Sequence, residues 1–295
     1  MSSLKELKNS IRSLKETQKI TEAMQMVSVN KLRRAQSDIK DASSYKFHIK
    51  DLLMKCAIDN CSKEDLSPLI RGTGRNKVYL LIVFTSEKGL CGGFNAQIIR
   101  FTRDRIKELV SEGKEAKIIV IGKKGYEGLF SDFSSIIIDY VEMPHNKPID
   151  FVYANIIANK VLSLFFDNIF DICFCIHSGF KSVVQQVPII FKLIPVDFLD
   201  ELQEKKECNY SIYLYDSSLY KLLEQILFKN ISAHIFWSLL ENKASEIGAR
   251  ITAMDSATRN AGRMVDDLVL SYNRQRQMRI TTELVEIIAG AEAIK

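Results

Sequence analysis

The sequence predicts an α/β protein in which two very long terminal helices, paired as an antiparallel coiled coil, flank a central Rossmann-like α/β domain with a mainly parallel sheet. All five prolines lie between Pro68 and Pro195, so no proline interrupts a helix at either end. Both ends also carry heptad repeats, and the middle alternates strand-like and helix-like segments. We therefore expect a helix in residues 1–60, the α/β domain in 70–205, and a second helix with a protruding tip in 210–295.

The N-terminal helix is expected over residues 3–58, which gives about 80 Å at roughly 1.5 Å per residue. Its heptad seam is apolar at both ends and polar in the middle, an arrangement that weakens packing but fixes the register of the pair. The seam positions are Leu4, Leu7, Ile11, Leu14, Gln18, Thr21, Gln25, Ser28, Leu32, Ala35 and Ile39.

The central segment contains five runs typical of buried strands, separated by segments with helical patterns. Strands are expected over residues 77–85, 117–121, 136–140, 169–176 and 187–193, and helices over 94–111, after the glycine-lysine turn 122–125, and over 149–166 with Asp150 in the first turn. Cys173 and Cys175 alternate within an apolar run, so they should face the same side of a buried strand. Gly179 is expected between the last two strands.

The C-terminal helix is expected over residues 212–290, about 115 Å at roughly 1.5 Å per residue. Its seam has regular 4-3 spacing, which supports a coiled coil. After Tyr272 the seam fails, because Gln275 and Arg279 take the next positions, and an apolar series restarts one residue out of phase at Ile280. The seam positions are Leu240, Ala244, Ile247, Ile251, Met254, Thr258, Ala261, Val265, Leu268 and Tyr272.

The two terminal helices join the central domain at their inner ends, so they should run antiparallel. If residue 58 lies beside residue 215, residue 4 lies beside residue 269. The helix from about residue 273 onward would then be single, and its apolar face would need a different partner.

The composition excludes several classes of protein. No run approaches about 18 uncharged apolar residues, so no membrane-spanning helix is expected, and the charged N-terminus resembles neither a signal peptide nor a transit peptide. Residues 1–60 hold 12 Lys and Arg against 7 Asp and Glu, which accounts for the whole net charge of +5. This excess is either a solvated helix face or a surface for an acidic partner. The six cysteines have no CxxC spacing and are expected to be reduced, buried thiols.

A glycine-rich turn, SEKGLCGGFN over residues 86–95, joins the first strand to the following helix. Turns in this position bind nucleotide phosphates in many folds, but the G-x-x-G-G spacing matches neither the dinucleotide nor the P-loop fingerprint. We therefore expect a tight turn, or a contact loop for a partner, rather than a phosphate cradle. Its candidate residues are Gly89, Cys91, Gly92, Gly93, Phe94 and Asn95.

No catalytic constellation stands out, so we expect no catalytic residue, metal site or cofactor in this chain. The four histidines are scattered, and His177-Ser178-Gly179 lacks the GxSxG nucleophile elbow. The basic cluster over residues 31–34, KLRR, lacks interleaved aromatic residues, so we do not expect nucleic acid as a partner.

Three separated motifs resemble one family, the gamma subunit of the F-type ATP synthase of bacteria. TQKITEAMQMV over residues 17–27, followed by KLRRAQ over 31–36, resembles its N-terminal coupling helix, and SEKGLCGGFN resembles its central-domain turn. The pattern I-T-x-E-x-x-E-x-x-x-G-A over residues 280–291 matches the family signature, and residues 244–258 are also similar. The resemblance covers all 295 residues.

The resemblance implies a rotor of the central stalk. The two end helices would turn inside a hexamer of alternating alpha and beta subunits, while the α/β domain would bind the epsilon subunit and the ring of c subunits near the membrane. Such a chain is a non-catalytic subunit that couples proton flow to ATP synthesis or hydrolysis at the beta subunits. It would lie peripherally on the cytoplasmic face of a bacterial inner membrane.

The same resemblance assigns contacts with partner subunits to residues of both helices. The chain departs from the family at Glu22, a position often basic in relatives, and at Gln25, a position often charged, so the local electrostatics should differ. The assigned residues are Met24, Lys31, Arg33 and Arg34 on the first helix, facing acidic loops of the beta subunits, and Arg250, Gln277, Thr281, Glu283 and Glu286 on the last, with Arg276 as a neighbour.

Two alternative functions come from other features of the sequence. A nucleotide-binding enzyme built on the α/β domain would show measurable affinity for ATP or a dinucleotide. A basic coiled-coil protein that binds nucleic acid would bind DNA with a strong dependence on salt. Neither alternative accounts for the C-terminal signature.

Overall fold

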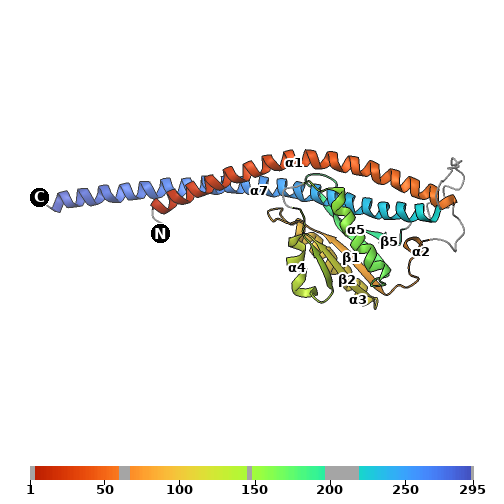
Figure 1. The fold of residues 1–295 in the computed structure, drawn as a ribbon. Coiled ribbons are helices and arrows are strands. Elements are labelled where there is room, and N and C mark those ends of the chain that lie inside the picture. Colours follow the sequence, from red (N-terminus) through yellow and green to blue (C-terminus); the bar gives the residue numbers. More distant parts are fainter. Residues whose placement is uncertain (1–3, 60–66, 145–147, 197–218, 294–295) are drawn as a thin grey trace. The chain divides into compact units, whose positions relative to one another are not determined.

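The computed structural model describes residues 4–59, 67–144, 148–196 and 219–293. It divides into two compact units, one of residues 1–30 with 250–295 and the other of residues 31–249. The terminal helices α1 (Leu4–Asp59) and α7 (Leu219–Ala293) each contribute to both units (Figure 1). Residues 212–218, where the last helix was expected to begin, lie outside the described residues.

In the first unit, α1 and α7 pair antiparallel along the predicted heptad seam. The Thr21 and Thr258 hydroxyls lie 2.7 Å apart. One turn further along, the Gln25 side-chain amide donates to a carboxylate oxygen of Asp255 at 3.4 Å. Every predicted seam residue from Leu4 to Ile39 and from Leu240 to Tyr272 is buried or half-buried. The antiparallel coiled coil is therefore confirmed.

The predicted register of the two helices is wrong by about one heptad. Leu4 lies seventeen residues before Thr21, and Gln275 lies seventeen residues after Thr258, so Leu4 is level with Gln275 rather than with residue 269. The expected register was set only by the inner ends of the two helices, with residue 58 beside residue 215. It did not take into account which polar residues of the seam pair with each other. Pairing Thr21 with Thr258 hydrogen-bonds two hydroxyls inside the seam, and this pairing fixes the register.

The second unit contains a five-stranded sheet in the order β3-β2-β1-β4-β5. The first four strands are parallel, and β5 pairs antiparallel with β4. This arrangement confirms the mainly parallel sheet expected from the alternating pattern. The strands are β1 (Val78–Phe84), β2 (Glu115–Ile121), β3 (Ile137–Val141), β4 (Ile172–Phe180) and β5 (Gln186–Ile194).

One strand boundary differs from the expectation. Gly179 was predicted between two strands, but it lies inside β4 and pairs with Val187 of β5. A side chain at this position would meet Ile189 at 2.2 Å, so the glycine leaves room for the cross-strand neighbour. The chain reverses after Phe180, at the turn in which Ser182 and Gln185 are hydrogen-bonded.

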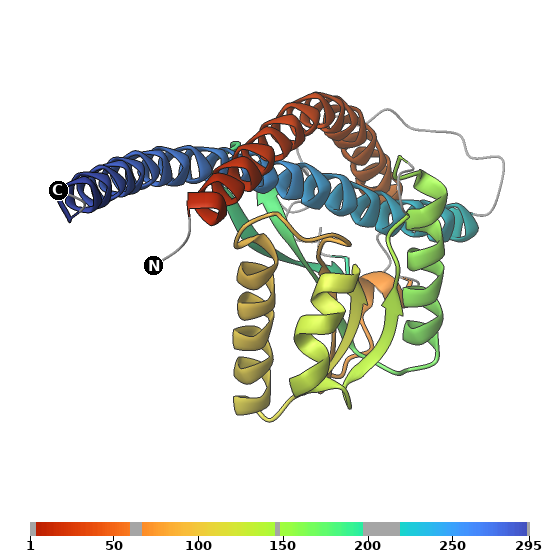
Figure 2. The same ribbon diagram turned by 90° about the vertical axis from the view of Figure 1, so that its left-hand side faces the viewer.

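Helices cover both faces of the sheet (Figure 2). One core contains residues of α3 and α4, and the other contains residues of α5 together with α1 and α7. The helix predicted from Ile149 begins two residues later, so Asp150 precedes its first turn. In the part of this unit that the structure describes, the helices besides α1 and α7 are α2 (Pro68–Arg71), α3 (Phe94–Ser111), α4 (Lys123–Phe133) and α5 (Phe151–Phe166).

Burial on both faces explains why the strands read as continuous apolar runs. In β1, Leu80 and Ile82 face the core with α5 and α7, whereas Leu81 and Val83 face the core with α3 and α4. Cys173 and Cys175 lie together in the first of these cores, as the alternation predicted.

The inner part of α7 belongs to this unit's core rather than to a separate rod. Five apolar residues at intervals of four, from Leu223 to Leu239, are fully buried against the sheet and α5. Because this part of α7 supplies so many buried residues of the core, it is fixed to the sheet. The five residues are Leu223, Leu227, Ile231, Ile235 and Leu239.

The described helices include none that is both long enough and apolar enough to cross a membrane. The described cysteines at positions 56, 91, 173 and 175 are buried and unbridged, which confirms that expectation for these four. Cys61 and Cys208 lie outside the described residues.

Candidate functional site

The end of α7 is a bare helix. From Arg276 to Ala291 every side chain is exposed, because the described part of α1 ends at Leu4, level with Gln275. Apolar residues lie open on this segment: Ile280 is 48% exposed, Leu284 54% and Ile287 67%. Among the described residues, α7 is thus a single helix from Arg276 onward, a few residues beyond the position near 273 where the sequence predicts this change.

Four predicted contact residues lie on this bare segment, within three turns of one another. Thr281 donates its hydroxyl to the carbonyl of Gln277 at 2.9 Å, and Glu283 pairs with Arg279 at 2.8 Å. Gln277 and Glu286 are exposed. The two interactions named here are made within the helix itself. The polar side chains of the four residues therefore lie on the exposed surface of α7.

The fifth contact position on α7, Arg250, and Met24 on α1 lie elsewhere in the same unit. Met24 is half-buried and its carbonyl accepts the Ser28 hydroxyl at 2.7 Å. Its neighbour Gln25 bonds Asp255, which lies 22 residues before Gln277, or about 33 Å along the helix. The structure therefore divides the predicted set into two levels, one around Met24 and one on the bare tip.

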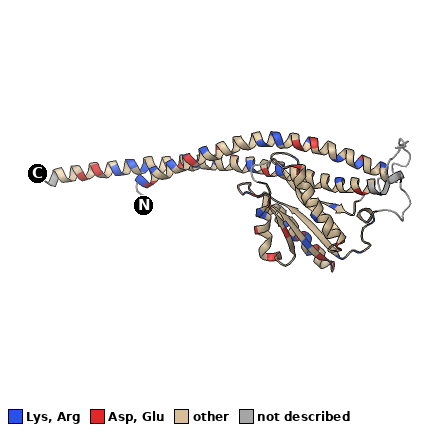
Figure 3. Ribbon diagram, in the orientation of Figure 1, with Lys and Arg blue, Asp and Glu red and all other residues tan. Residues whose placement is uncertain are grey.

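A charged layer lies at the level of Met24. Asp255 accepts the amide of Gln25 and also pairs with Arg259 at 2.6 Å. The predicted departure at Gln25 thus makes a specific bond across the seam. Lys31, Arg33 and Arg34 lie further along α1 in the second unit and are exposed. Figure 3 shows that charges of both signs follow α1 and α7.

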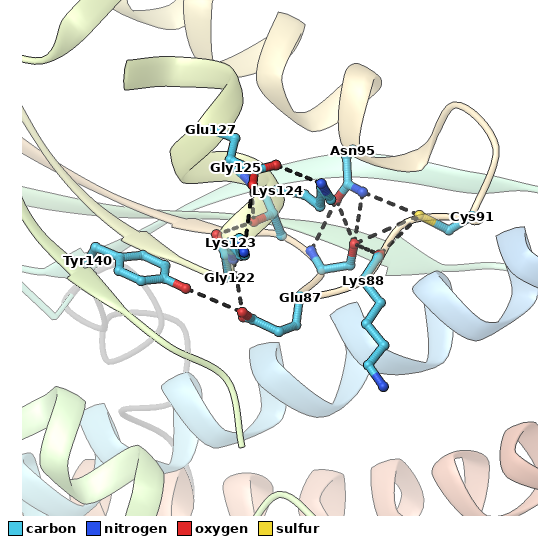
Figure 4. Close-up of polar contacts among 12 residues, drawn as sticks. Glu87, Lys88, Cys91, Asn95, Gly122, Lys123, Lys124, Gly125, Glu127 and Tyr140 are labelled. Carbon is cyan, nitrogen blue, oxygen red and sulfur yellow. Dashed lines mark hydrogen bonds and ion pairs between the residues drawn. The ribbon is translucent and has the colours of Figure 1, made fainter. Parts of the chain in front are cut away.

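The glycine-rich turn forms a closed hydrogen-bonded loop (Figure 4). The Asn95 side chain fills it: its Oδ1 accepts the Ser86 N–H at 3.0 Å, and its Nδ2 donates to Cys91 Sγ at 3.3 Å. Cys91 and Phe94 are buried beneath the turn. These contacts confirm a tight turn.

One residue of this loop was not singled out from the sequence. Leu90 has a left-handed backbone, with φ at 62°, and its side chain is 63% exposed. A residue with a side chain adopts this conformation at a cost of roughly 1–2 kcal/mol. The turn therefore holds an apolar side chain in solvent at a cost in backbone strain.

A carboxylate occupies the start of α4, where a nucleotide phosphate would otherwise be attracted. Glu87 accepts the N–H of Lys123 at 3.1 Å and the Tyr140 hydroxyl at 3.3 Å (Figure 4). It also accepts the N–H of Met143 at 3.2 Å. Burial, with Glu87 as the next cause, raises the pKa of Tyr140 to about 12. The next two N–H groups, of Lys124 and Gly125, bond Ser86 and Thr85. This helix terminus is closed to an anion.

A second polar cluster, which the sequence alone did not reveal, joins α7 to the ends of two strands. Asn242 accepts the Ser178 N–H at 3.2 Å and donates to the Thr85 carbonyl at 3.3 Å, and Ser245 donates to the Ser178 carbonyl at 2.8 Å. We call these four residues the α7 clasp. The only signal in the sequence was the family likeness over residues 244–258, which gives no function for Asn242 or Ser245.

An ionisable cluster lies next to the α7 clasp. His177, fully buried, pairs with Glu241 at 2.7 Å. The Lys46 ammonium lies 3.6 Å from the centre of the Trp237 ring, and burial lowers the pKa of Lys46 to about 8 although Glu241 opposes the shift. The motif His177-Ser178 therefore binds α7 and forms no nucleophile site.

Comparison with known proteins decides the family. A family model described as ATP synthase matches residues 3–294. The chain is 45% identical to the ATP synthase gamma chain of Bartonella quintana and 48% identical to that of Brucella suis, over the full length of both chains in each pair. The chain belongs to the ATP synthase gamma chain family. The gamma chain of Rhizobium etli is a further relative, 46% identical over the full length of both chains.

Solved structures agree on the fold. The chain is similar to one from the Euglena gracilis mitochondrial ATP synthase, with a TM-score of 0.67 and 18% identity over 99% of this chain and 94% of that one. A chain of the Tetrahymena thermophila central stalk and c-ring has a TM-score of 0.60 and 23% identity, over 81% of this chain and 99% of that one.

Membership of the ATP synthase gamma chain family gives the chain its role. It is the rotor subunit of the central stalk of an ATP synthase, a membrane-associated complex. Neither alternative is favoured: the carboxylate at the start of α4 argues against a nucleotide site, and the C-terminal signature is left unexplained by nucleic-acid binding.

Proposed function

We propose that the bare end of α7 turns inside a hexamer of alpha and beta subunits, while the α/β unit binds the epsilon subunit and the c-ring. The observation that carries this proposal is the segment from Arg276 to Ala291, on which Leu284 and Ile287 are more than half exposed. A run of exposed apolar residues on a single helix needs an apolar partner surface.

The proposed coupling depends on asymmetry. A shaft shifts the conformation of a surrounding subunit only if it makes contacts of different energy with the alternative states. The tip is one helix with apolar and polar sides, so each beta subunit meets a different face at any angle. Rotation then takes each catalytic site through its states in turn, and this chain itself catalyses nothing.

We assign the partner contacts to the two levels of the first unit and to two further surfaces. Met24 and Arg250 serve the level of the charged layer, and Gln277, Thr281, Glu283 and Glu286 serve the tip. Lys31, Arg33 and Arg34 face acidic loops of the beta subunits. The loop from Gly89 to Asn95 is a further contact with a partner, with Leu90 at its centre. Exposure supports the assignment for the basic residues of α1, the four residues of the tip, and Leu90 in the loop. Met24 and Arg250 are half-buried, and Cys91 and Phe94 are buried beneath the loop that they support.

Two neighbouring threonines provide a direct test of the tip assignment. Thr281 and Thr282 are both exposed, and each donates its hydroxyl to the carbonyl four residues earlier, at 2.9 and 3.0 Å. Loss of one contact hydrogen bond costs about 0.5–1.5 kcal/mol, or roughly 2- to 10-fold in an equilibrium constant. In the assembled complex, Thr281→Val should lower the rate of ATP-driven proton pumping by roughly that factor, and Thr282→Val should not. Equal effects of the two changes would refute the assignment.

The remaining parts of the proposal concern location and activity. We place the chain on the cytoplasmic face of a bacterial inner membrane, held there only through the complex. The purified chain should bind neither ATP nor DNA, since α4 is closed to anions and the basic residues of α1 lack aromatic partners. Equilibrium binding of labelled ATP and of duplex DNA at low salt tests this directly. Micromolar affinity for either ligand would contradict it.

A further inference from the structure

The α7 clasp binds the backbone of two adjacent strands at once. Thr85 is the first residue after β1, and Ser178 lies near the carboxyl end of β4, which pairs with β1. Both backbone groups of Ser178 and the carbonyl of Thr85 take their partners from α7. Asn242 is 1% exposed and Ser245 fully buried. These are buried, directional contacts between one face of the helix and the sheet.

Folding alone does not require such polar groups at this place. The same helix is already held by the apolar series from Leu223 to Leu239. A buried amide that makes two hydrogen bonds adds little net stability, because it gives up equivalent bonds to water. Apolar packing is non-directional, whereas bonds from Asn242 and Ser245 to two strands fix the angle of α7 about its own axis.

Further contacts next to the α7 clasp hold the same angle. The fully buried His177 pairs with the half-buried Glu241 at 2.7 Å, and these residues adjoin Ser178 in β4 and Asn242 in α7. Gly248 lies three residues beyond Ser245, where an added side chain would come within 3.2 Å of the Phe180 ring. The helix backbone thus lies close against the hairpin of β4 and β5.

We propose that Asn242 and Ser245 are positioning residues that lock α7 to the sheet against torque. The inference rests on the proposed function, since it concerns force passing between the shaft and the α/β unit. Because α7 is one continuous helix, a torque on its tip reaches the α7 clasp as rotation about the helix axis. Three hydrogen bonds to the ends of two strands resist that rotation. Apolar packing alone would allow the helix to turn, because it has no preferred direction.

The test compares two buried serines of α7. Ser245 donates to the sheet, whereas Ser238, also fully buried, donates to the carbonyl of His234 in its own helix. In the complex with its partner subunits, Ser245→Ala should lower the number of protons pumped per ATP hydrolysed by at least twofold. Ser238→Ala should leave this ratio unchanged, and Ser245→Thr, which keeps the hydroxyl, should restore it.

A second measurement separates positioning from a loss of stability. With a probe on the α/β unit of a complex whose hexamer is fixed, the angular fluctuations should widen in Ser245→Ala and widen further with Asn242→Leu. A purely structural role would lower the yield of complex without changing the ratio or the fluctuations, and that result would overturn the inference. A wild-type complex that pumps no protons would instead contradict the proposed function.

Discussion

In the second unit, single polar side chains bind backbone groups of other segments near the carboxyl ends of strands. Glu87 holds the start of α4, Asn95 fills the turn before α3, and Asn242 joins α7 to β1 and β4. Each bonds backbone groups of another segment and so holds two segments together. Residues that look like candidates for chemistry in the sequence therefore have architectural roles here.

Burial of His234 leads to a prediction about pH. Burial, with the charges of Lys46 and Lys50 as lesser causes, lowers the pKa of His234 to about 3 from 6.5. Between these values the unfolded chain binds a proton that the folded chain does not, so the free energy of unfolding falls as the pH falls. The free energy of unfolding changes by at most about 1.4 kcal/mol per pH unit from this one group. The contribution of neutral His234 to stability is fully present above the pKa that histidine has in the unfolded chain.

Urea unfolding at pH 7 and at pH 5 measures this effect. The wild-type chain should lose stability at the lower pH, and His234→Gln should lose less. The matched control, His48→Gln, removes an exposed histidine from α1 and should leave the difference between the two pH values unchanged. The same loss in His234→Gln as in the wild type would show that this prediction is wrong.

Residue roles were predicted unevenly from the sequence, for a physical reason. The turn over residues 86–95 was identified because glycine spacing reports local backbone geometry. The α7 clasp was missed because Thr85 and Asn242 are 157 residues apart. A polar residue within a helical pattern gives no indication of which distant backbone group it binds.

Secondary-structure elements were located well because periodicity reports burial. Every strand and helix predicted in the central segment is found within a few residues of its predicted place. The register of α1 against α7 was not predicted correctly. Heptads repeat, so a shift of one helix by seven residues preserves the apolar pattern of the seam. Polar pairs such as Thr21 and Thr258 decide between these registers, and their pairing is visible only in the folded chain.

The turn between β2 and α4 depends on one glycine. Gly122 has φ at 100°, and a side chain there would lie 2.7 Å from the Thr85 carbonyl oxygen. Gly122→Ala combines backbone strain with a collision against main chain, so it should cost more than about 3 kcal/mol. Gly74 also has a positive φ, at 72°, but no atom lies within 4 Å of the added side chain. Gly74→Ala should cost only about 1 kcal/mol.

Urea unfolding of the full chain compares the two alanine variants with the wild type. The predicted order of the unfolding midpoints is wild type, then Gly74→Ala, then Gly122→Ala well below both. Similar losses in the two variants would show that the close approach to Thr85 has no energetic consequence.

At the scale of the whole molecule, each of the two units uses α1 and α7 differently. In the first unit the helices form a seam with a polar middle, and in the second α7 is buried in the core of a sheet. This division suits a rotor: the second unit holds the helix firmly, and the tip keeps its own surface free for partner subunits.

Removal of the tip tests this division of roles. Residues 276–291 have exposed side chains, so deleting residues 276–295 should change the free energy of unfolding of the sheet unit by less than about 0.5 kcal/mol. Assembly with the alpha and beta subunits should fall severalfold. A variant of full length, with Ile280, Leu284 and Ile287 changed to serine, should show the same loss of assembly. Equal loss of folding and assembly in both variants would contradict the division.

The most direct test of the rotor account is co-purification with the partner subunits. The chain is expressed with its cognate alpha and beta subunits, the complex is isolated by size, and its ATPase is measured with and without this chain. We expect a stable assembly with one copy for every three alpha–beta pairs, and multi-site ATPase activity that requires this chain. A chain that elutes alone and leaves the ATPase activity unchanged would contradict the rotor account.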